Sequence, residues 1–303
     1  MAPLFYGGIV LLGKHLLGIY EKAFDSSLSW GERFDTARSI GFDFLELSID
    51  ESDLRLERLK QDSSERAAIA QASRDYGVPI LSMCLSAHRR FPLGSMDPDT
   101  RRKSLDIMES AIDLAAELGV RTIQLAAYDV YYEQSTPETR ELYYIGLQKV
   151  VEMAEQRCVM LANEIMDTGF VNSVSRHLEY ERAANSPWLK LYPDLGNLTA
   201  WGNDVASELR RGKGSIVQVH LKDTLAVRPG FSGKFRDVPF GSGCVDFPLC
   251  FSVLERTGYS GPYLIEIWHK PGINDRETIT SAKKYIEQCF NDAGELSLGR
   301  YAV

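Results

Sequence analysis

Eight short apolar segments recur along the chain, and a stretch with helical spacing separates each of them from the next. They are residues 16–21, 42–49, 80–87, 122–128, 160–166, 189–194, 216–222 and 263–268. In the stretch after the third segment, five apolar residues fall on one helical face: Leu105, Met108, Ile112, Ala115 and Leu118. This alternation predicts a parallel sheet with crossover helices, and eight repeats predict a closed α/β barrel of the (β/α)₈ or TIM type.

Polar side chains occupy alternate positions near the ends of several of these segments. In residues 216–222, Gln218, His220 and Lys222 share one side, and apolar residues occupy the other. In residues 263–268, Glu266 likewise opposes an apolar set. We expect the apolar sides to meet the helices and the polar sides to face the barrel interior near its mouth. An open doubly wound sheet would not place inward polar groups at the ends of so many strands.

The chain is long enough, at 303 residues, for one large domain or two average ones, and no low-complexity run or linker divides it. We therefore expect a single barrel domain over residues 16–292. Residues 1–15 are expected to be an N-terminal extension, either disordered or foreign to the native protein. Residues 293–303 are expected to form a C-terminal tail.

The net charge of −8 argues against a nucleic-acid partner, although a small anionic substrate could still bind in a local basic pocket. No segment approaches the length of a membrane span. The five cysteines are odd in number and form no CxxC pair, which predicts reduced thiols and a cytoplasmic protein. The sequence does not decide whether the protein is a monomer or a homodimer.

Four residues with strong metal-ligand side chains close four successive predicted strands: Glu164, Asp194, His220 and Glu266. On a barrel these side chains converge, and three carboxylates with one imidazole suit Mn²⁺, Mg²⁺, Co²⁺ or Zn²⁺. Taken singly, each could be an ion-paired residue at a strand end. Together, three buried carboxylates without a cation would repel one another, so the sequence predicts a single divalent-metal site.

Six longer motifs carry a family resemblance. They lie at residues 18–23 (Gly-Ile-Tyr-Glu-Lys-Ala), 82–94, 124–132, 164–167 (Glu-Ile-Met-Asp), 192–197 (Tyr-Pro-Asp-Leu-Gly-Asn) and 261–266. The chain closely resembles the L-ribulose-5-phosphate 3-epimerases, also described as L-xylulose-5-phosphate 3-epimerases, of the xylose-isomerase-like TIM-barrel superfamily. The likeness covers about residues 16–287. It departs from the family in the N-terminal extension, in the insert-like stretch 225–234 and after Asp292.

The resemblance implies that a metal-bound ketopentose phosphate is epimerised at C3 by two opposed carboxylates, and that Mn²⁺ is the favoured metal. Inverting a carbon next to a carbonyl requires a base on one face and an acid on the other. A divalent cation stabilises the enediolate that forms between the two proton transfers. Strands five and eight lie on nearly opposite sides of a barrel, so we assign Glu164 and Glu266 as the acid/base pair as well as ligands.

Further residues are candidates for binding the sugar phosphate, each beside an alternative structural role. They are His88, Arg89, Asn197, Lys222, Arg236, Gly241, Ser242, Gly243 and Glu21. Backbone N–H groups of Gly241–Gly243, with Arg236 and Lys222, could hold the phosphate, although Gly-Ser-Gly also fits a plain turn. Asn197 could bind a hydroxyl or cap a helix. Glu46, like Glu21, belongs to an early strand with inward parity, and both are expected either to support the metal ligands or to orient the substrate.

Other functions remain open at this stage. The nearest is a ketose 3-epimerase that acts on an unphosphorylated sugar. An aldose–ketose isomerase would need a second metal, and an endonuclease of the same superfamily would need a basic groove and more than the five histidines present. A non-catalytic sugar-phosphate-binding barrel is the alternative from a different class.

Overall fold

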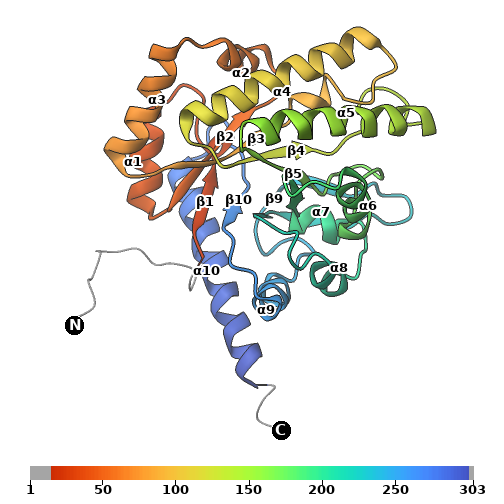
Figure 1. Ribbon diagram of the computed structural model, residues 1–303. Helices are drawn as coiled ribbons and strands as arrows, with labels where there is room; N and C mark the ends of the chain where they lie inside the picture. Colours follow the sequence, from red (N-terminus) through yellow and green to blue (C-terminus); the bar gives the residue numbers. More distant parts are fainter. Residues whose placement is uncertain (1–14, 300–303) are drawn as a thin grey trace, which may run out of the picture.

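The computed structural model describes residues 15–299, and its main sheet confirms the predicted barrel (Figure 1). The strands are β1 (Leu17–Tyr20), β2 (Phe44–Ile49), β3 (Ile80–Leu85), β4 (Thr122–Ala126), β5 (Met160–Glu164), β6 (Leu189–Tyr192), β7 (Val219–Leu221) and β10 (Tyr263–Ile265). Each lies within one of the predicted segments. The order β6-β5-β4-β3-β2-β1-β10-β7 is parallel throughout.

The barrel closes between β6 and β7 through two isolated parallel bridges rather than a continuous ladder. Leu191 pairs with Ile216, and Asp194 pairs with His220. The backbone N–H of His220 also donates to the carbonyl of Pro193 at 3.0 Å. The closure between β6 and β7 therefore places two of the predicted metal ligands, Asp194 and His220, side by side.

Helices surround the strands (Figure 1). They are α1 (Trp30–Ile40), α2 (Asp53–Leu56), α3 (Ser63–Tyr76), α4 (Pro98–Leu118), α5 (Pro137–Gln156), α6 (Val174–Ala184), α7 (Leu195–Ala200), α8 (Val205–Arg211), α9 (Phe247–Thr257) and α10 (Asp275–Gly299). Capping residues in the sequence mark where these helices begin and end. Ser29 and Glu32 form a capping box at the start of α1, and Gly41 ends that helix in the left-handed conformation. In α4, Met108, Ile112 and Ala115 are buried as their spacing predicts.

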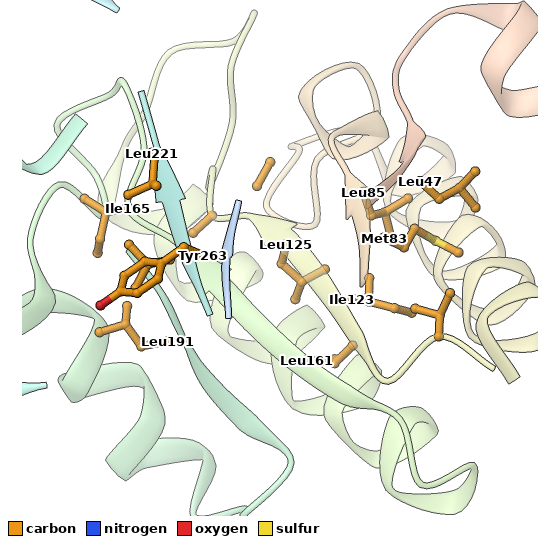
Figure 2. Close-up of a cluster of buried hydrophobic side chains, with 14 of the residues drawn as sticks. Leu47, Met83, Leu85, Ile123, Leu125, Leu161, Ile165, Leu191, Leu221 and Tyr263 are labelled. Atoms are coloured by element: carbon orange, nitrogen blue, oxygen red, sulfur yellow. The ribbon is translucent and has the colours of Figure 1, made fainter. Parts of the chain in front are cut away.

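Two apolar layers lie on either side of the strands. The larger one, part of which Figure 2 shows, packs outward-facing strand residues such as Leu125, Leu161 and Leu191 against the helices. The smaller one lies inside the barrel and consists of Tyr20, Phe44, Cys84 and Leu264. The ring of Phe44 leaves no room for a side chain at Gly18, where a Cβ would lie 2.3 Å from it. In β7 and β10 the larger layer contains Val219, Leu221, Tyr263 and Ile265, and the smaller one contains Leu264, which confirms the predicted inside–outside alternation.

The insert-like stretch 225–234 belongs to an antiparallel hairpin that the sequence did not foresee. It is formed by β8 (Asp223–Leu225) and β9 (Lys234–Val238), directly after β7. At the C-terminal end, α10 continues past Asp292 to Gly299, so residues 293–299 of the expected tail are helical. At the other end, His15 is buried and packs against Tyr259 and Tyr263. The rest of the expected extension, residues 1–14, lies outside the described residues.

All five cysteines lie in the described part, and none forms a disulfide. Among residues 15–299, no helix combines the length and the hydrophobicity needed to cross a membrane.

Candidate metal centre

The four predicted ligands meet at one point inside the mouth of the barrel. One potential ligand atom from each of Glu164, Asp194, His220 and Glu266 lies within 4.8 Å of the others. All four residues are buried, with at most 6% of their surface exposed. Nδ1 of His220 lies 3.0 Å from Oε1 of Glu164, 4.0 Å from Oδ2 of Asp194 and 3.8 Å from Oε2 of Glu266.

Local structure positions each of these side chains. Glu164 is the last residue of β5, and the amide of Gln124 on β4 donates to its Oε2. Asp194 caps the N-terminus of α7: its Oδ1 accepts from the backbone N–H of Asn197 at 2.7 Å, and its Oδ2 lies 2.9 Å from the ammonium group of Lys222. Glu266 follows β10 directly, and its N–H donates to the carbonyl of Leu221.

Glu46, on β2, orients the imidazole ring of His220. Nε2 of His220 lies 2.9 Å from Oε1 of Glu46, and a carboxylate can only accept, so Nε2 carries the proton. Glu46 Oε2 also accepts from Ser82 at 2.6 Å and from Tyr192 at 2.8 Å. The pairing directs Nδ1 of His220 toward the three carboxylates, as a carboxylate–histidine–metal arrangement requires.

The residues present fit a divalent cation. Oδ2 of Asp194 and Oε2 of Glu266 are both buried atoms. The ammonium group of Lys222 lies 2.9 Å from the first and 3.0 Å from the second, and it is the nearest positive charge to both. Three buried carboxylates around one imidazole are a hard, oxygen-rich donor set with unused lone pairs, which suits a cation of this class.

The site shifts the pKa values of its own groups in opposite directions. Burial raises the pKa of Asp194, and the nearby charges of Glu266 and Glu164 raise it further. Burial also raises the pKa of Glu164, although His220 opposes this. Burial acts in the same sense on Glu266, but the charges of Lys222 and His220 outweigh it and lower the pKa of that carboxyl. The two glutamates therefore differ in proton affinity.

A cavity opens above these ligands. It is lined by Tyr20, Lys22, Cys84, Ser86, Arg89, Tyr128, Glu164, Met166, Asp167, Asn197, Lys222, Arg236, Glu266 and Trp268. The structure thus brings six of the predicted catalytic and substrate-binding residues to one space. Asp194 and His220 lie beneath the lining.

Two predicted substrate contacts lie away from this cavity. His88 is buried, and its Nε2 donates to the carbonyl of Ser104 at 3.2 Å. Glu21 is fully buried and forms ion pairs with Arg33, Arg55 and Arg58. Burial alone would raise the pKa of Glu21, but the hydrogen bond and charge of Arg58 and the charges of the other arginines lower it to about 2. Both side chains are occupied by protein groups, so neither is free to bind a sugar in this geometry.

The loop Gly241–Gly243, predicted as a phosphate contact, directs two of its backbone N–H groups at a carboxylate of the protein. The backbone N–H groups of Gly241 and Gly243 both donate to Oδ2 of Asp223 at 2.9 Å, and that of Ser242 donates to Pro239. A carboxylate of the protein itself therefore occupies the donors that a phosphate would need. Gly243 is required there, because an added Cβ would lie 2.0 Å from Oδ1 of Asp223.

Asn197 and Lys222 lie beside the predicted metal ligands. The side-chain amide of Asn197 donates to the carbonyl of Ile165, and its Oδ1 is buried without a partner. The alternative that Asn197 caps the following helix is wrong, because Asp194 holds that position. Lys222 lies against Asp194 and Glu266 at the centre of the site rather than at its rim.

Sequence reasoning missed several residues of the cavity wall. Trp268 shares the inward side of its strand with Glu266, and Arg236 lies over its ring at 5.3 Å from the centroid. Lys22 and Tyr20 flank the end of β1. Asp167 accepts a hydrogen bond from Tyr128 at 2.5 Å. Strand parity could have found Trp268, and the family motifs at residues 18–23 and 164–167 contain Tyr20, Lys22 and Asp167, although no role was assigned to these three.

Comparison with known proteins agrees with this geometry. The family model of the xylose isomerase-like TIM barrel matches residues 34–289. SgbU from Haemophilus influenzae is 50% identical over 283 residues, which cover 93% of this chain and 99% of that protein. The L-ribulose-5-phosphate 3-epimerase UlaE from Escherichia coli (strain ATCC 8739) is 48% identical over 285 residues, 94% of this chain and 98% of that protein.

Solved structures share the fold at lower identity. An L-ribulose 3-epimerase has a TM-score of 0.75 and 19% identity, and the match covers 95% of this chain and 98% of that one. The D-allulose 3-epimerase from Methylomonas sp., in complex with D-allulose, has a TM-score of 0.73 and 18% identity over 90% of this chain and 96% of that one. The chain is an isomerase of the epimerase class. It belongs to the L-ribulose-5-phosphate 3-epimerase family within the xylose isomerase-like TIM barrels.

Proposed function

We propose that the protein interconverts L-ribulose 5-phosphate and L-xylulose 5-phosphate by epimerisation at C3. The observation that carries the proposal is the convergence of Glu164, Asp194, His220 and Glu266 at the mouth of the barrel. Relatives that span nearly the whole chain are named as epimerases of this sugar phosphate.

The cluster is the proposed site of one divalent cation, with Mn²⁺ favoured and Mg²⁺, Co²⁺ or Zn²⁺ as alternatives. Such a cation would polarise the substrate carbonyl and stabilise the negative charge that develops on the substrate oxygens. The chain supplies the four ligands, and Glu46 fixes the orientation of the histidine. The buried setting of the four residues keeps water away from the charges.

Glu164 and Glu266 are the proposed proton carriers. β6 and β7 separate the strands that bear them, so the two carboxyl groups approach a bound sugar from different sides. One carboxylate takes the proton from C3, and the electron pair of the broken C–H bond moves toward C2 and its oxygen. The other carboxyl group then delivers a proton to the opposite face of C3. The direction of reaction decides which glutamate acts as the base.

Arg89 and Arg236 are the proposed contacts for the phosphate. Both line the cavity, whereas the Gly-Ser-Gly loop has no free N–H group at Gly241 or Gly243. The guanidinium of Arg89 is held between Tyr128 and Tyr131, and its buried Nε has no hydrogen-bond partner. A dianionic phosphate at this rim would be separated from the acidic centre of the site.

The decisive experiment is an exchange measurement in D₂O. The protein is incubated with Mn²⁺ and L-xylulose 5-phosphate, then with L-ribulose 5-phosphate, and the products are analysed by NMR. We expect deuterium at C3 and conversion of each sugar phosphate into the other. Exchange with the free sugars at equal efficiency would favour the unphosphorylated alternative. Metal binding without any exchange would favour a non-catalytic barrel.

A further inference from the structure

Three arginines surround one carboxylate in a pocket beside the barrel mouth. The carboxylate is Glu21, in the 3₁₀ turn η1 (Glu21–Ala23) that follows β1. Arg33 comes from α1, Arg55 from α2, and Arg58 from the 3₁₀ turn η2 (Glu57–Lys60). All three arginines line the pocket, together with Trp30, Lys60 and Gln61. The lining shares no residue with that of the catalytic cavity.

The charges in this cluster do not balance. The side chains of Arg33, Arg55 and Arg58 are only 5%, 8% and 14% exposed, and all three pair with the single charge of Glu21. The cluster alone therefore carries two excess positive charges away from bulk water, which is costly without a further anion. Burial lowers the pKa of Arg33, and the neighbouring Arg58 and Arg55 lower it further despite Glu21.

The other carboxylates near the pocket have partners of their own. Glu57 pairs with Lys60 at 2.6 Å, and Glu65 accepts from the backbone N–H of Asp62 at 3.0 Å. Asp25 accepts from the backbone and the hydroxyl of Ser27. None of these three lies within ion-pair distance of the arginines among the described contacts, although the charge of Asp25 acts to raise the pKa of Arg33.

Two buried polar atoms of the pocket residues also lack partners. They are Nε of Arg33, a donor, and Oε1 of Gln61, an acceptor. Arg33 is 4% exposed, so water does not readily satisfy its free N–H. The guanidinium groups of Arg33 and Arg58 both lie 5.0 Å from the ring centroid of Trp30, which holds them in place.

We propose that this pocket is a second oxyanion site, which binds inorganic phosphate or the phosphate group of a small phosphorylated molecule. A dianion would neutralise the two excess charges, and its oxygens match the planar donor forks of arginine. A hydroxyl of a monoprotonated phosphate could donate to Gln61. The inference does not depend on the proposed reaction, because it uses no residue of the metal centre or the catalytic cavity.

The first test uses the fluorescence of Trp30. The full-length protein is titrated with inorganic phosphate at constant ionic strength, and tryptophan emission is recorded. Trp268 lies in the catalytic cavity, so the two rings report on different places. We expect a saturable change that survives Trp268→Phe and disappears in Trp30→Phe. A response that depends on Trp268 and not on Trp30 would overturn the proposal.

The second test measures phosphate binding by calorimetry in the Arg236→Gln background, which removes a cation from the catalytic rim. Adding Arg55→Gln should raise the Kd for phosphate by about tenfold or more, since a charge-assisted hydrogen bond is lost. The matched control is Arg102→Gln, which removes an exposed arginine paired with Asp99. It should leave the Kd unchanged.

Equal Kd values for Arg55→Gln and Arg102→Gln would overturn the proposal. So would a rise in KM for the sugar phosphate in Arg55→Gln alone, because the pocket would then hold the phosphate of the substrate itself. If Arg55→Gln fails to fold, the comparison of Trp30→Phe with Trp268→Phe still decides the matter.

Discussion

Glu46 accepts a hydrogen bond from Nε2 of His220 at 2.9 Å, although 174 residues separate the two in the chain. β2 and β7 bring them together across the barrel interior, with β1 and β10 between them in the sheet. Because Glu46 fixes the proton on Nε2, the lone pair of Nδ1 is directed toward Glu164, Asp194 and Glu266 once that nitrogen is deprotonated.

Glu46→Gln should weaken divalent-metal binding. An amide can still contact Nε2, but it no longer offers a negative charge that raises the basicity of the imidazole. We expect the affinity for Mn²⁺ to fall by about 10- to 100-fold, measured by calorimetry on the folded variant. Ser82→Ala is the matched control, because it removes one donor to Glu46 and leaves the contact with His220. Unchanged affinity in Glu46→Gln would mean that His220 needs no such support.

Glu164→Gln and Glu266→Gln should each reduce kcat by at least about 10²- to 10⁴-fold while the protein stays folded. Each substitution removes a ligand charge and a proton carrier, so the losses should not add in the double variant. Steady-state kinetics at measured metal occupancy checks this. Glu109→Gln, at an exposed position of α4, serves as the control. Near-normal kcat with full metal occupancy would remove that glutamate from the acid/base pair.

The strands and the convergence of Glu164, Asp194, His220 and Glu266 could be predicted from sequence because both follow from local alternation. A residue such as His220 reveals its inward direction through its immediate neighbours, Val219 and Leu221. The ion pairs of Glu21 could not be predicted in this way. Its partners Arg33, Arg55 and Arg58 lie 12, 34 and 37 residues along the chain, and no periodicity connects them.

The hydrogen-bond partner of the Gly-Ser-Gly loop could not be predicted from the sequence either. Its glycines correctly indicated a backbone conformation that other residues disfavour, since Gly241 has a φ of 81°. The sequence could not show which group its N–H donors would meet. Asp223, 18 residues before Gly241, fills that role only because the β8–β9 hairpin folds back over the strand end.

His88→Gln should alter acid stability rather than substrate binding. Burial lowers the pKa of His88 from its ordinary value of 6.5 to about 4. Between these values the unfolded chain binds the proton and the folded one does not, so this contribution to stability is lost as the pH falls from about 6.5 to 4. The full effect is up to about 3 kcal/mol.

Urea unfolding at several pH values should therefore show that His88→Gln is less sensitive to acid than the unmodified chain over this window. KM for the sugar phosphate should stay within about twofold, since His88 donates to Ser104 and does not line the cavity. A raised KM together with unchanged acid sensitivity would indicate that His88 binds the substrate.

Arg236→Gln should raise KM for the phosphorylated sugar selectively. Arg236 lies on β9 over the ring of Trp268 and lines the cavity, so its charge is available to a phosphate at the rim. We expect KM for L-ribulose 5-phosphate to rise about fivefold with little change in kcat, because the contact is made equally in the ground state and the transition state. Any residual activity on free L-ribulose should be unaffected, since that sugar lacks the group that the arginine contacts.

Arg228→Gln is the matched control for Arg236→Gln. It removes the same charge from the loop of the same hairpin, but Arg228 lies over Phe231 and does not line the cavity. The two variants thus share any general effect of reduced positive potential near the mouth, and a difference between them isolates direct contact with the phosphate. Equal losses on phosphorylated and free sugar in Arg236→Gln would show instead that this arginine acts by stacking on Trp268. Arg89 would then be the remaining cation of the proposed phosphate contact.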